Sequence, residues 1–160
     1  MTTPLPICGT VYGVLLNAHA EWRSAQALMN DAPYKAPPIA PVLYVKTANT
    51  WTACEGAIAV PSDVPQVEVG ATLGVVMGAH GQAKAYVLLN DVSVPHTVAQ
   101  QGFYRPPVKY KNLDGFLGVG AQAVHAEAIS NPNGFNWRCA STRCCNKRLI
   151  CPPCAAKPQP

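Results

Sequence analysis

Proline and glycine interrupt this sequence so often that its apolar runs stay short. The chain of 160 residues contains 16 Pro and 12 Gly, and the stretch 32–41 alone holds four prolines. Proline lacks an amide proton and has a fixed φ angle, so it ends helices and is kept out of sheet interiors. The apolar runs between these breaks have the length of strands. The sequence therefore predicts a mainly β fold with α additions.

The expected elements follow from composition and periodicity. Four segments are rich in β-branched, aromatic and aliphatic residues and are expected to form strands: 10–16, 42–45, 67–77 and 86–94. A helix is expected over 18–29, where good helix formers follow Asn17, a suitable N-cap residue. The stretch 115–120 reads as a glycine-rich turn that leads into 121–129.

Composition excludes some classes of protein. Hydrophobic residues make up 49% of the chain and charged residues 12%, which is too apolar for a disordered polar chain. The length suits one domain with a real core. No apolar run reaches the roughly 18 residues of a spanning helix, so no membrane partner is expected. The first residues lack a basic stretch followed by an apolar one, so we expect no secretory signal and a cytoplasmic location.

Charge and cysteine change abruptly near Asn133. Residues 134–160 carry five basic side chains and no acidic one, whereas residues 1–133 carry seven basic and eight acidic side chains. The net charge of +4 therefore belongs to the end of the chain, and nucleic acid is not an expected partner. Two cysteines, Cys8 and Cys54, lie in the first part, and the other five lie together: Cys139, Cys144, Cys145, Cys151 and Cys154.

Three interpretations of this cysteine-rich segment stay open. It could be a small zinc-binding module, although it has a single Cys-x-x-Cys pair, at Cys151 and Cys154. It could form disulfides, which are rare in the cytoplasm. It could also be read out of frame, because a frame one base earlier, starting in the codon of Gly134, permits Val-Arg-Val-Asn within an alternating, strand-like pattern. We expect 1–133 to form a partial domain and 134–160 to be an aberrant tail.

Several side chains are candidates for a functional site. Asp91 follows Asn90 at the end of an apolar strand, where a carboxylate can bind a divalent metal ion or close an Asx turn. Lys111 precedes a glycine-containing turn and can bind a substrate carboxylate, or lie solvated on the surface. Tyr104 and Arg105 together suit a planar dicarboxylate.

Two histidines are candidates for proton transfer. His19 follows the first expected strand, and His96 follows Asp91 by five residues. The imidazole pKa lies near neutral pH, so either side chain could act as an acid or a base. Each could equally be an ordinary surface or core histidine.

Five strings between residues 9 and 133 occur in an order typical of a known family: GTVYGVLLN, APYKAPPIAPVLYVKTANTW, VEVGATLGVVMG, LLNDVSVPH and FYRPPVKYK. On these strings the chain resembles the fumarylacetoacetate hydrolase family. It is most similar to the first half, or separate first subunit, of members that act as decarboxylase and isomerase in 4-hydroxyphenylacetate catabolism. The resemblance implies a mixed β-sandwich roll, here truncated or frameshifted after about Asn133.

The resemblance also implies a site and its ligands. Active members bind Mg²⁺ or Mn²⁺ through a Glu-x-Glu pair and an Asp, and Asp91 matches that Asp. The substrate would be an unsaturated 2-oxo polycarboxylate, with Lys111, His19 and His96 in catalytic positions. Four residues match positions that would face the substrate: Tyr104, Arg105, Lys46 and Asn49.

One departure from the family pattern bears on the metal. The Glu-x-Glu pair is absent, because Gly70 and Thr72 stand in its place and Glu68 lies two residues too early. One carboxylate does not hold a hard divalent cation tightly. The chain could therefore be a non-catalytic subunit that supports a metal-bearing homologous half, or form a homo-oligomer.

The out-of-frame interpretation makes a prediction about the gene. We expect the DNA from the codon of Met77 to beyond Pro160 to contain a missing or extra base near Gly134. Correcting it would restore Val-Arg-Val-Asn and continue the frame. Resequencing checks this, and a DNA sequence that matches the printed chain would contradict it.

Overall fold

The described chain contains three β-sheets. The computed structural model describes residues 7–17, 19–32, 34–95 and 108–132, together with the backbone of 144–145 and 148–150. Helices within these ranges are short. The mainly β fold with α additions is therefore confirmed, and its central sheet is mixed.

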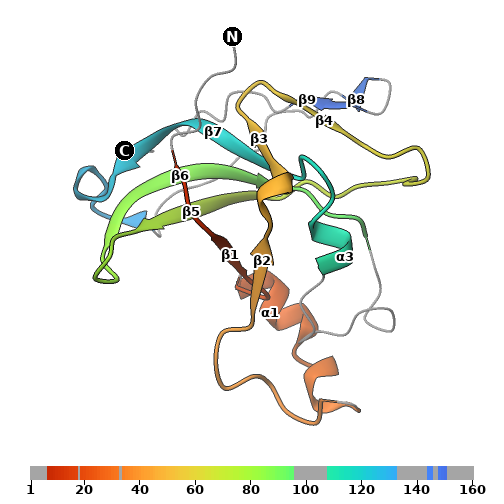
Figure 1. Ribbon diagram of the computed structural model, residues 1–160. Coiled ribbons are helices and arrows are strands. Elements are labelled where there is room, and N and C mark those ends of the chain that lie inside the picture. Colours follow the sequence, from red (N-terminus) through yellow and green to blue (C-terminus); the bar gives the residue numbers. More distant parts are fainter. Residues whose placement is uncertain are drawn as a thin grey trace.

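The central sheet has four strands in the order β3-β7-β6-β5. These are β3 (Trp51–Ala53), β7 (Leu117–His125), β6 (Ala83–Asp91) and β5 (Ala71–Met77). β3 is parallel to β7, whereas the β7–β6 and β6–β5 pairs are antiparallel. Figure 1 shows β5, β6 and β7 as a curved sheet.

Two smaller sheets flank the central one. The first is a ribbon in which β1 (Val11–Val14) pairs antiparallel with β2 (Leu43–Lys46). The second has the order β4-β9-β8, from β4 (Ala57–Ala59), β9 (Arg148–Ile150) and β8 (Cys144–Cys145). The last two strands lie in the segment expected to be an aberrant tail, and only their backbone is described.

The helical elements of the described residues have at most seven residues. They are α1 (His19–Ala25), η1 (Leu28–Asn30), η2 (Ala48–Thr50), α3 (Val108–Lys111) and η3 (Ala126–Ala128). In the described ranges no helix has the length and hydrophobicity needed to cross a membrane.

The four expected strands are confirmed, with shifted ends. β1, β2, β5 and β6 occupy 11–14, 43–46, 71–77 and 83–91. The expected helix over 18–29 is shorter, because α1 ends at Ala25 and a separate 3-10 turn follows.

The interpretation of 115–120 as a turn is wrong over most of its length. β7 begins at Leu117 and runs through both Gly118 and Gly120. A Cβ atom at Gly120 would lie 2.9 Å from the carbonyl oxygen of Leu88 on β6. Glycine in this strand therefore permits a close approach of the neighbouring backbone, which sequence reasoning took for a turn signal.

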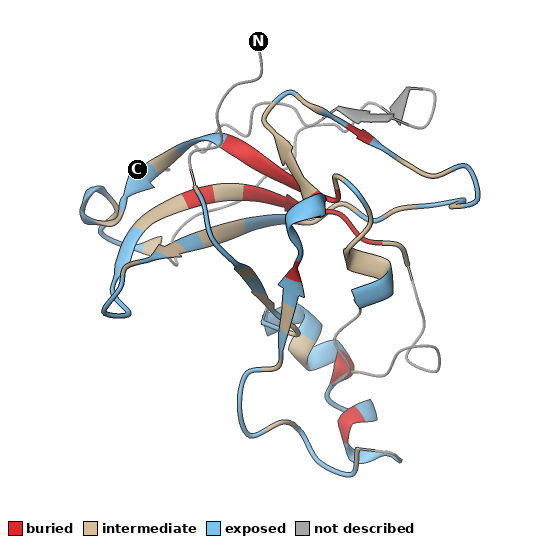
Figure 2. Cartoon of the chain, in the orientation of Figure 1, coloured by how far each residue is buried: buried red, intermediate tan, exposed pale blue. Residues whose placement is uncertain are grey.

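The core lies at one end of the central sheet. Figure 2 shows buried residues gathered where β6 ends and β7 begins, whereas the opposite ends of these strands are largely exposed. One buried cluster contains Ile58, Val92 and Phe116. The other contains Val87, Leu89, Leu117 and Val119. The loop residues that follow β6 and precede β7 are therefore anchored in the core.

The β1–β2 ribbon has two chemically different faces. Tyr12 pairs with Val45 and Val14 pairs with Leu43, and all four side chains are exposed. The opposite face carries Tyr44 and the buried Lys46. The ribbon thus directs its polar face toward the end of β6.

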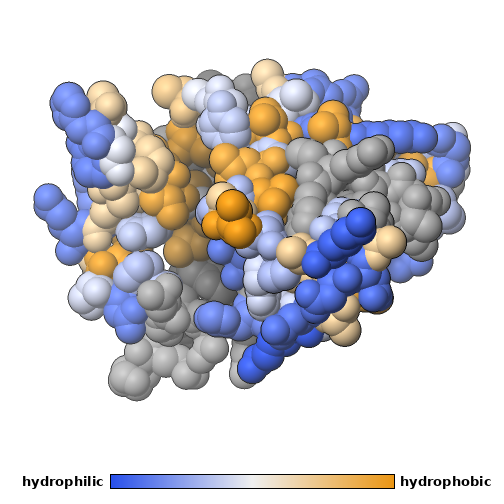
Figure 3. Space-filling model, turned by 90° about the horizontal axis from the view of Figure 1, so that it is seen from below, coloured by the Kyte–Doolittle hydropathy of each residue, from blue (hydrophilic) through white to orange (hydrophobic). Residues whose placement is uncertain are grey.

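Figure 3 shows the molecule from below the view of Figure 1. Hydrophobic residues gather near the centre of the surface seen in this view.

Among the described residues Phe116 is the largest fully buried side chain, so its truncation should be costly. We expect Phe116→Ala to lower the free energy of unfolding by about 3–5 kcal/mol, because it leaves a cavity between Ile58 and Val92. Val75→Ala, at an exposed position of β5, should change it by less than about 0.5 kcal/mol. Urea unfolding followed by circular dichroism measures both, and equal effects would contradict this position of the core.

Candidate active site

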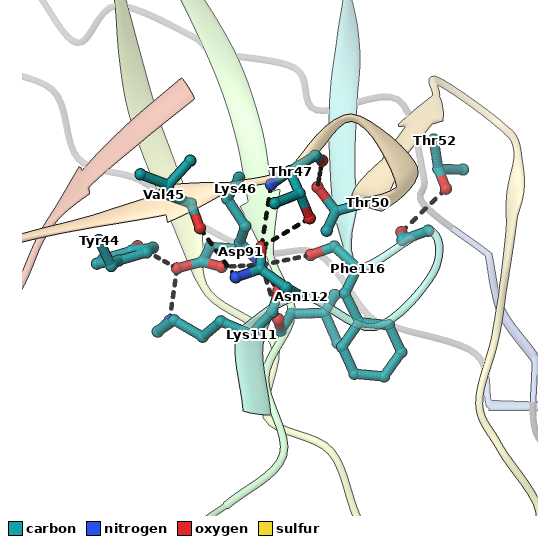
Figure 4. Close-up of polar contacts among 12 residues, drawn as sticks. Tyr44, Val45, Lys46, Thr47, Thr50, Thr52, Asp91, Lys111, Asn112 and Phe116 are labelled. Atoms are coloured by element: carbon teal, nitrogen blue, oxygen red, sulfur yellow. Dashed lines mark hydrogen bonds and ion pairs between the residues drawn. The ribbon is translucent and has the colours of Figure 1, made fainter. Parts of the chain in front are cut away.

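Asp91, the last residue of β6, binds two ammonium groups. Its Oδ1 lies 2.7 Å from Nζ of Lys46, and its Oδ2 lies 2.6 Å from Nζ of Lys111. The hydroxyl of Tyr44 donates a hydrogen bond of 2.5 Å to the same Oδ2. Figure 4 shows these side chains converging on Asp91 from β2 and α3. The carboxylate side chain is only 11% exposed.

Lys46 is held in a cage of oxygen atoms. Its Nζ donates to the carbonyl oxygens of Lys111, Phe116 and Val92, at 2.5, 2.9 and 3.1 Å. Three acceptors on one nitrogen need the three protons of an ammonium group. Oδ1 of Asp91 lies 2.7 Å from the same nitrogen, so an ion pair adds to these three hydrogen bonds.

Lys111 is the more accessible of the two lysines. Its side chain is 15% exposed, against 2% for Lys46. Its Nζ also lies 4.8 Å from the centre of the Tyr44 ring, a distance at which the ring attracts a cation. Lys111 is therefore the ammonium group that a small molecule can approach.

Gly13 on β1 has no side chain, and this leaves room for the Tyr44 ring. A Cβ atom at Gly13 would lie 2.0 Å from the Tyr44 ring, so no larger residue fits opposite it. Because side chains alternate along a strand, Tyr44 and Lys46 share one face of β2. Both therefore meet the end of β6 together.

Asn112 fixes Lys111 against β2. Its side-chain amide donates to the carbonyl oxygen of Val45 at 2.9 Å and accepts from the amide of Thr47 at 3.0 Å. In this way the amide group imitates a strand neighbour at the end of β2. Asn49 adds bonds to the Asn112 carbonyl at 3.2 Å and to Asp114 at 2.6 Å.

Burial and charge shift the pKa values of the site in opposite ways. Burial raises the pKa of Asp91, but the attraction of Lys111 and Lys46 outweighs it and holds that pKa below the ordinary value. Burial lowers the pKa of Lys46, an effect that Asp91 opposes. Burial, and then the charge of Asp91, raise the pKa of Tyr44 well above its ordinary value. The phenol is therefore neutral at physiological pH.

The residues present do not fit a divalent metal ion. Both oxygens of Asp91 already contact ammonium groups. No group of three or more His, Cys, Asp and Glu side chains gathers within the described ranges. Gly70 lies opposite Asp91, and the backbone amide of Asp91 donates a hydrogen bond of 2.8 Å to the carbonyl oxygen of Gly70. Glu68 is exposed and pairs through its backbone with Ser93, two residues beyond Asp91. The sheet thus offers Asp91 alone.

The structure brings together three of the residues selected from the sequence. Asp91, Lys111 and Lys46 are in direct contact, and Asn49 supports the loop after Lys111. His19 lies exposed at the start of α1, and no described contact joins it to Asp91. The remaining three lie outside the described residues: His96, Tyr104 and Arg105.

Tyr44 was missed by sequence reasoning. The signal was present, because Tyr44 and Lys46 stand two residues apart in an expected strand and so share a face. Asn112 gave no comparable signal, since its role depends on a chain segment far away in the sequence.

Comparison with known proteins gives a family and relatives. The sequence profile described as fumarylacetoacetate (FAA) hydrolase C-terminal matches residues 10–143. A 4-hydroxyphenylacetate degradation bifunctional isomerase/decarboxylase of Escherichia coli is 34% identical over 122 residues, which are 70% of this chain and 27% of the relative. The counterpart from Salmonella dublin is 33% identical over 125 residues, 72% of this chain and 28% of the relative. The chain thus spans little more than a quarter of these relatives.

Solved structures share the fold. A 2-keto-3-deoxy-D-arabinonate dehydratase complexed with magnesium and 2,5-dioxopentanoate matches with a TM-score of 0.61 and 23% identity, covering 82% of this chain and 44% of that one. A 5-carboxymethyl-2-hydroxymuconate delta-isomerase from Mycobacterium smegmatis matches with a TM-score of 0.55 and 21% identity, covering 78% and 49%. These likenesses support the fold class.

Removing the charge of Asp91 should destabilise the protein in a pH-dependent way. We expect Asp91→Asn to lower the free energy of unfolding at pH 7 by about 3 kcal/mol, since it leaves buried Lys46 without its counter-ion. The folded-state pKa of Asp91 is depressed, so its contribution is present above the unfolded pKa, about 3.9, and is lost as pH falls through the folded pKa.

The difference between wild type and Asp91→Asn should therefore shrink below about pH 4. Urea unfolding at pH 7 and pH 3 measures it. The exposed Asp63→Asn is the matched control and should stay within about 0.5 kcal/mol of wild type at both pH values. A pH-independent loss in Asp91→Asn would contradict the ionic role.

Proposed function

Because this chain belongs to the fumarylacetoacetate hydrolase family, we propose that it forms part of a decarboxylase and isomerase acting on an unsaturated 2-oxo polycarboxylate. The named activity of the E. coli and Salmonella relatives supports this choice. The specific substrates would be 5-oxopent-3-ene-1,2,5-tricarboxylate and the 2-hydroxyhepta-2,4-diene-1,7-dioate made from it, in 4-hydroxyphenylacetate catabolism. The reaction would take place in the cytoplasm.

The observation that carries the proposal is the partly exposed ammonium group of Lys111 beside Tyr44 and Asp91. Two lysines and one carboxylate give the cluster a net charge of +1, since Tyr44 is neutral. A substrate carboxylate is attracted to such a site, and Lys111 is the cation it can reach.

Decarboxylation of a 2-oxo acid of this kind needs a cation near the carbonyl oxygen. When the bond to the leaving carboxylate breaks, its electron pair moves into the substrate and the carbonyl becomes an enolate. A fixed positive group close to that oxygen stabilises the developing charge. Lys111 would supply this charge as CO₂ leaves, and the Tyr44 ring would help to hold its ammonium group in place. A proton from water would go to the enolate oxygen to give the 2-hydroxydiene. Loss of that proton and protonation at carbon by water would complete the isomerisation.

The metal of the family belongs in this proposal to another half of the enzyme. Mg²⁺ or Mn²⁺ would be held by a homologous half that carries the Glu-x-Glu pair, because Asp91 alone does not fit it here. Residues 1–133 would form the partial family domain, and 134–160, whose β9 backbone pairs with β4, would be an aberrant tail. His19, His96, Tyr104 and Arg105 remain predicted site residues on this basis.

A second candidate is a non-catalytic subunit that supports such a half. Two observations favour it: Gly70 and Thr72 offer no carboxylate to a metal ion, and both oxygens of Asp91 already contact ammonium groups. A zinc-binding module has less support, because it depends on cysteine side chains outside the described residues: Cys139, Cys144, Cys145, Cys151 and Cys154.

A single substitution separates the two candidates. The full chain is mixed with a homologue that carries Glu-x-Glu, and loss of 5-oxopent-3-ene-1,2,5-tricarboxylate is followed by absorbance. In a catalytic role, Lys111→Met should lower kcat/KM by on the order of 10²-fold, because the enolate loses its cation. Lys84→Met, an exposed lysine on β6, is the matched control and should keep wild-type turnover.

If the chain raises turnover of the partner and Lys111→Met changes nothing, the supporting role is correct. If no mixture that contains the chain exceeds the partner alone, both candidates are wrong.

A further inference from the structure

The surroundings of the Lys46 nitrogen are those of a bound cation. Four oxygen atoms lie within 3.1 Å of Nζ: one carboxylate oxygen from Asp91 and three backbone carbonyl oxygens. Carboxylate and carbonyl oxygens are the ligands that hard metal ions take in proteins. In this chain an ammonium group fills that environment, and its side chain is 2% exposed.

The neighbouring strand disfavours a carboxylate directly opposite Asp91. The β5–β6 register pairs Ala71 with Asn90, which sets Gly70 opposite Asp91. A Cβ atom at Gly70 would lie 3.0 Å from the Asp91 carbonyl oxygen, tighter than ordinary contact. A longer side chain at this position would need the two backbones to move apart.

The charge of the cluster points the same way. Lys46 and Lys111 both contact Asp91, so one negative charge already faces two positive charges. A divalent cation at Asp91 would add two further charges next to both ammonium groups. Like charges at such short distances repel strongly in a partly buried site.

We infer that the Lys46 ammonium is the resident cation of this site, and that the chain binds no divalent metal ion at Asp91. The inference deepens the proposed function and rests on it only where the catalysed reaction is concerned. Metal binding is measured without turnover, so its failure and that of the proposed function can be told apart.

Mn²⁺ binding to the full chain tests the inference. Free Mn²⁺ is measured by electron paramagnetic resonance during a titration. Wild type should show no saturable uptake. Lys46→Ala vacates the oxygen cage and should take up one Mn²⁺ per chain, where wild type takes up none. The matched control Lys84→Ala should behave as wild type.

Circular dichroism checks that each variant is folded, and a stabilising osmolyte is added to every sample if Lys46→Ala unfolds without it. Uptake of one Mn²⁺ by wild type that Asp91→Asn abolishes would overturn the inference. A folded Lys46 variant that takes up no Mn²⁺ would also overturn it, because the cage would then not be a cation site.

Discussion

The buried carboxylate of Asp91 is the constraint on which the rest of the site depends. A charged group with 11% exposure needs partners, and it obtains them from β2 and α3, which are distant in sequence. Lys46 connects further parts of the chain, because its three ammonium protons bind backbone carbonyl oxygens after β6, at the end of α3 and before β7. One ionic centre thus joins four parts of the chain.

Much of the fold could be predicted, because it depends on local signals. Short apolar runs between prolines and glycines gave four strands within a few residues of their observed ends. The prediction of a turn over 115–120 was wrong, because Gly120 lies in a strand and permits the close approach of Leu88 on the neighbouring strand. Neither this approach nor the parallel pairing of β3 with β7 leaves a trace in the local sequence.

The candidate site was predicted in its chemistry and less in its arrangement. Asp91 and Lys111 were selected as a metal ligand and a substrate-binding group, and they are in fact bonded to each other. The family resemblance also implied that Gly70 and Thr72 stand where active members carry carboxylates. It could not show that Lys46 turns inward, because a lysine on a four-residue strand is usually solvated. Only the contact between separate elements makes its burial favourable.

The two faces of the β1–β2 ribbon have a consequence for folding. A slip of β2 by one residue would turn Val45 toward Asp91 and leave Lys46 in solvent. Such a slip would leave the buried carboxylate of Asp91 without the counter-ion Lys46. The ionic centre therefore favours the observed strand register over the slipped one. Electrostatics thus contributes to the alignment of β2, since its outward-facing residues Leu43 and Val45 are apolar and would gain from burial.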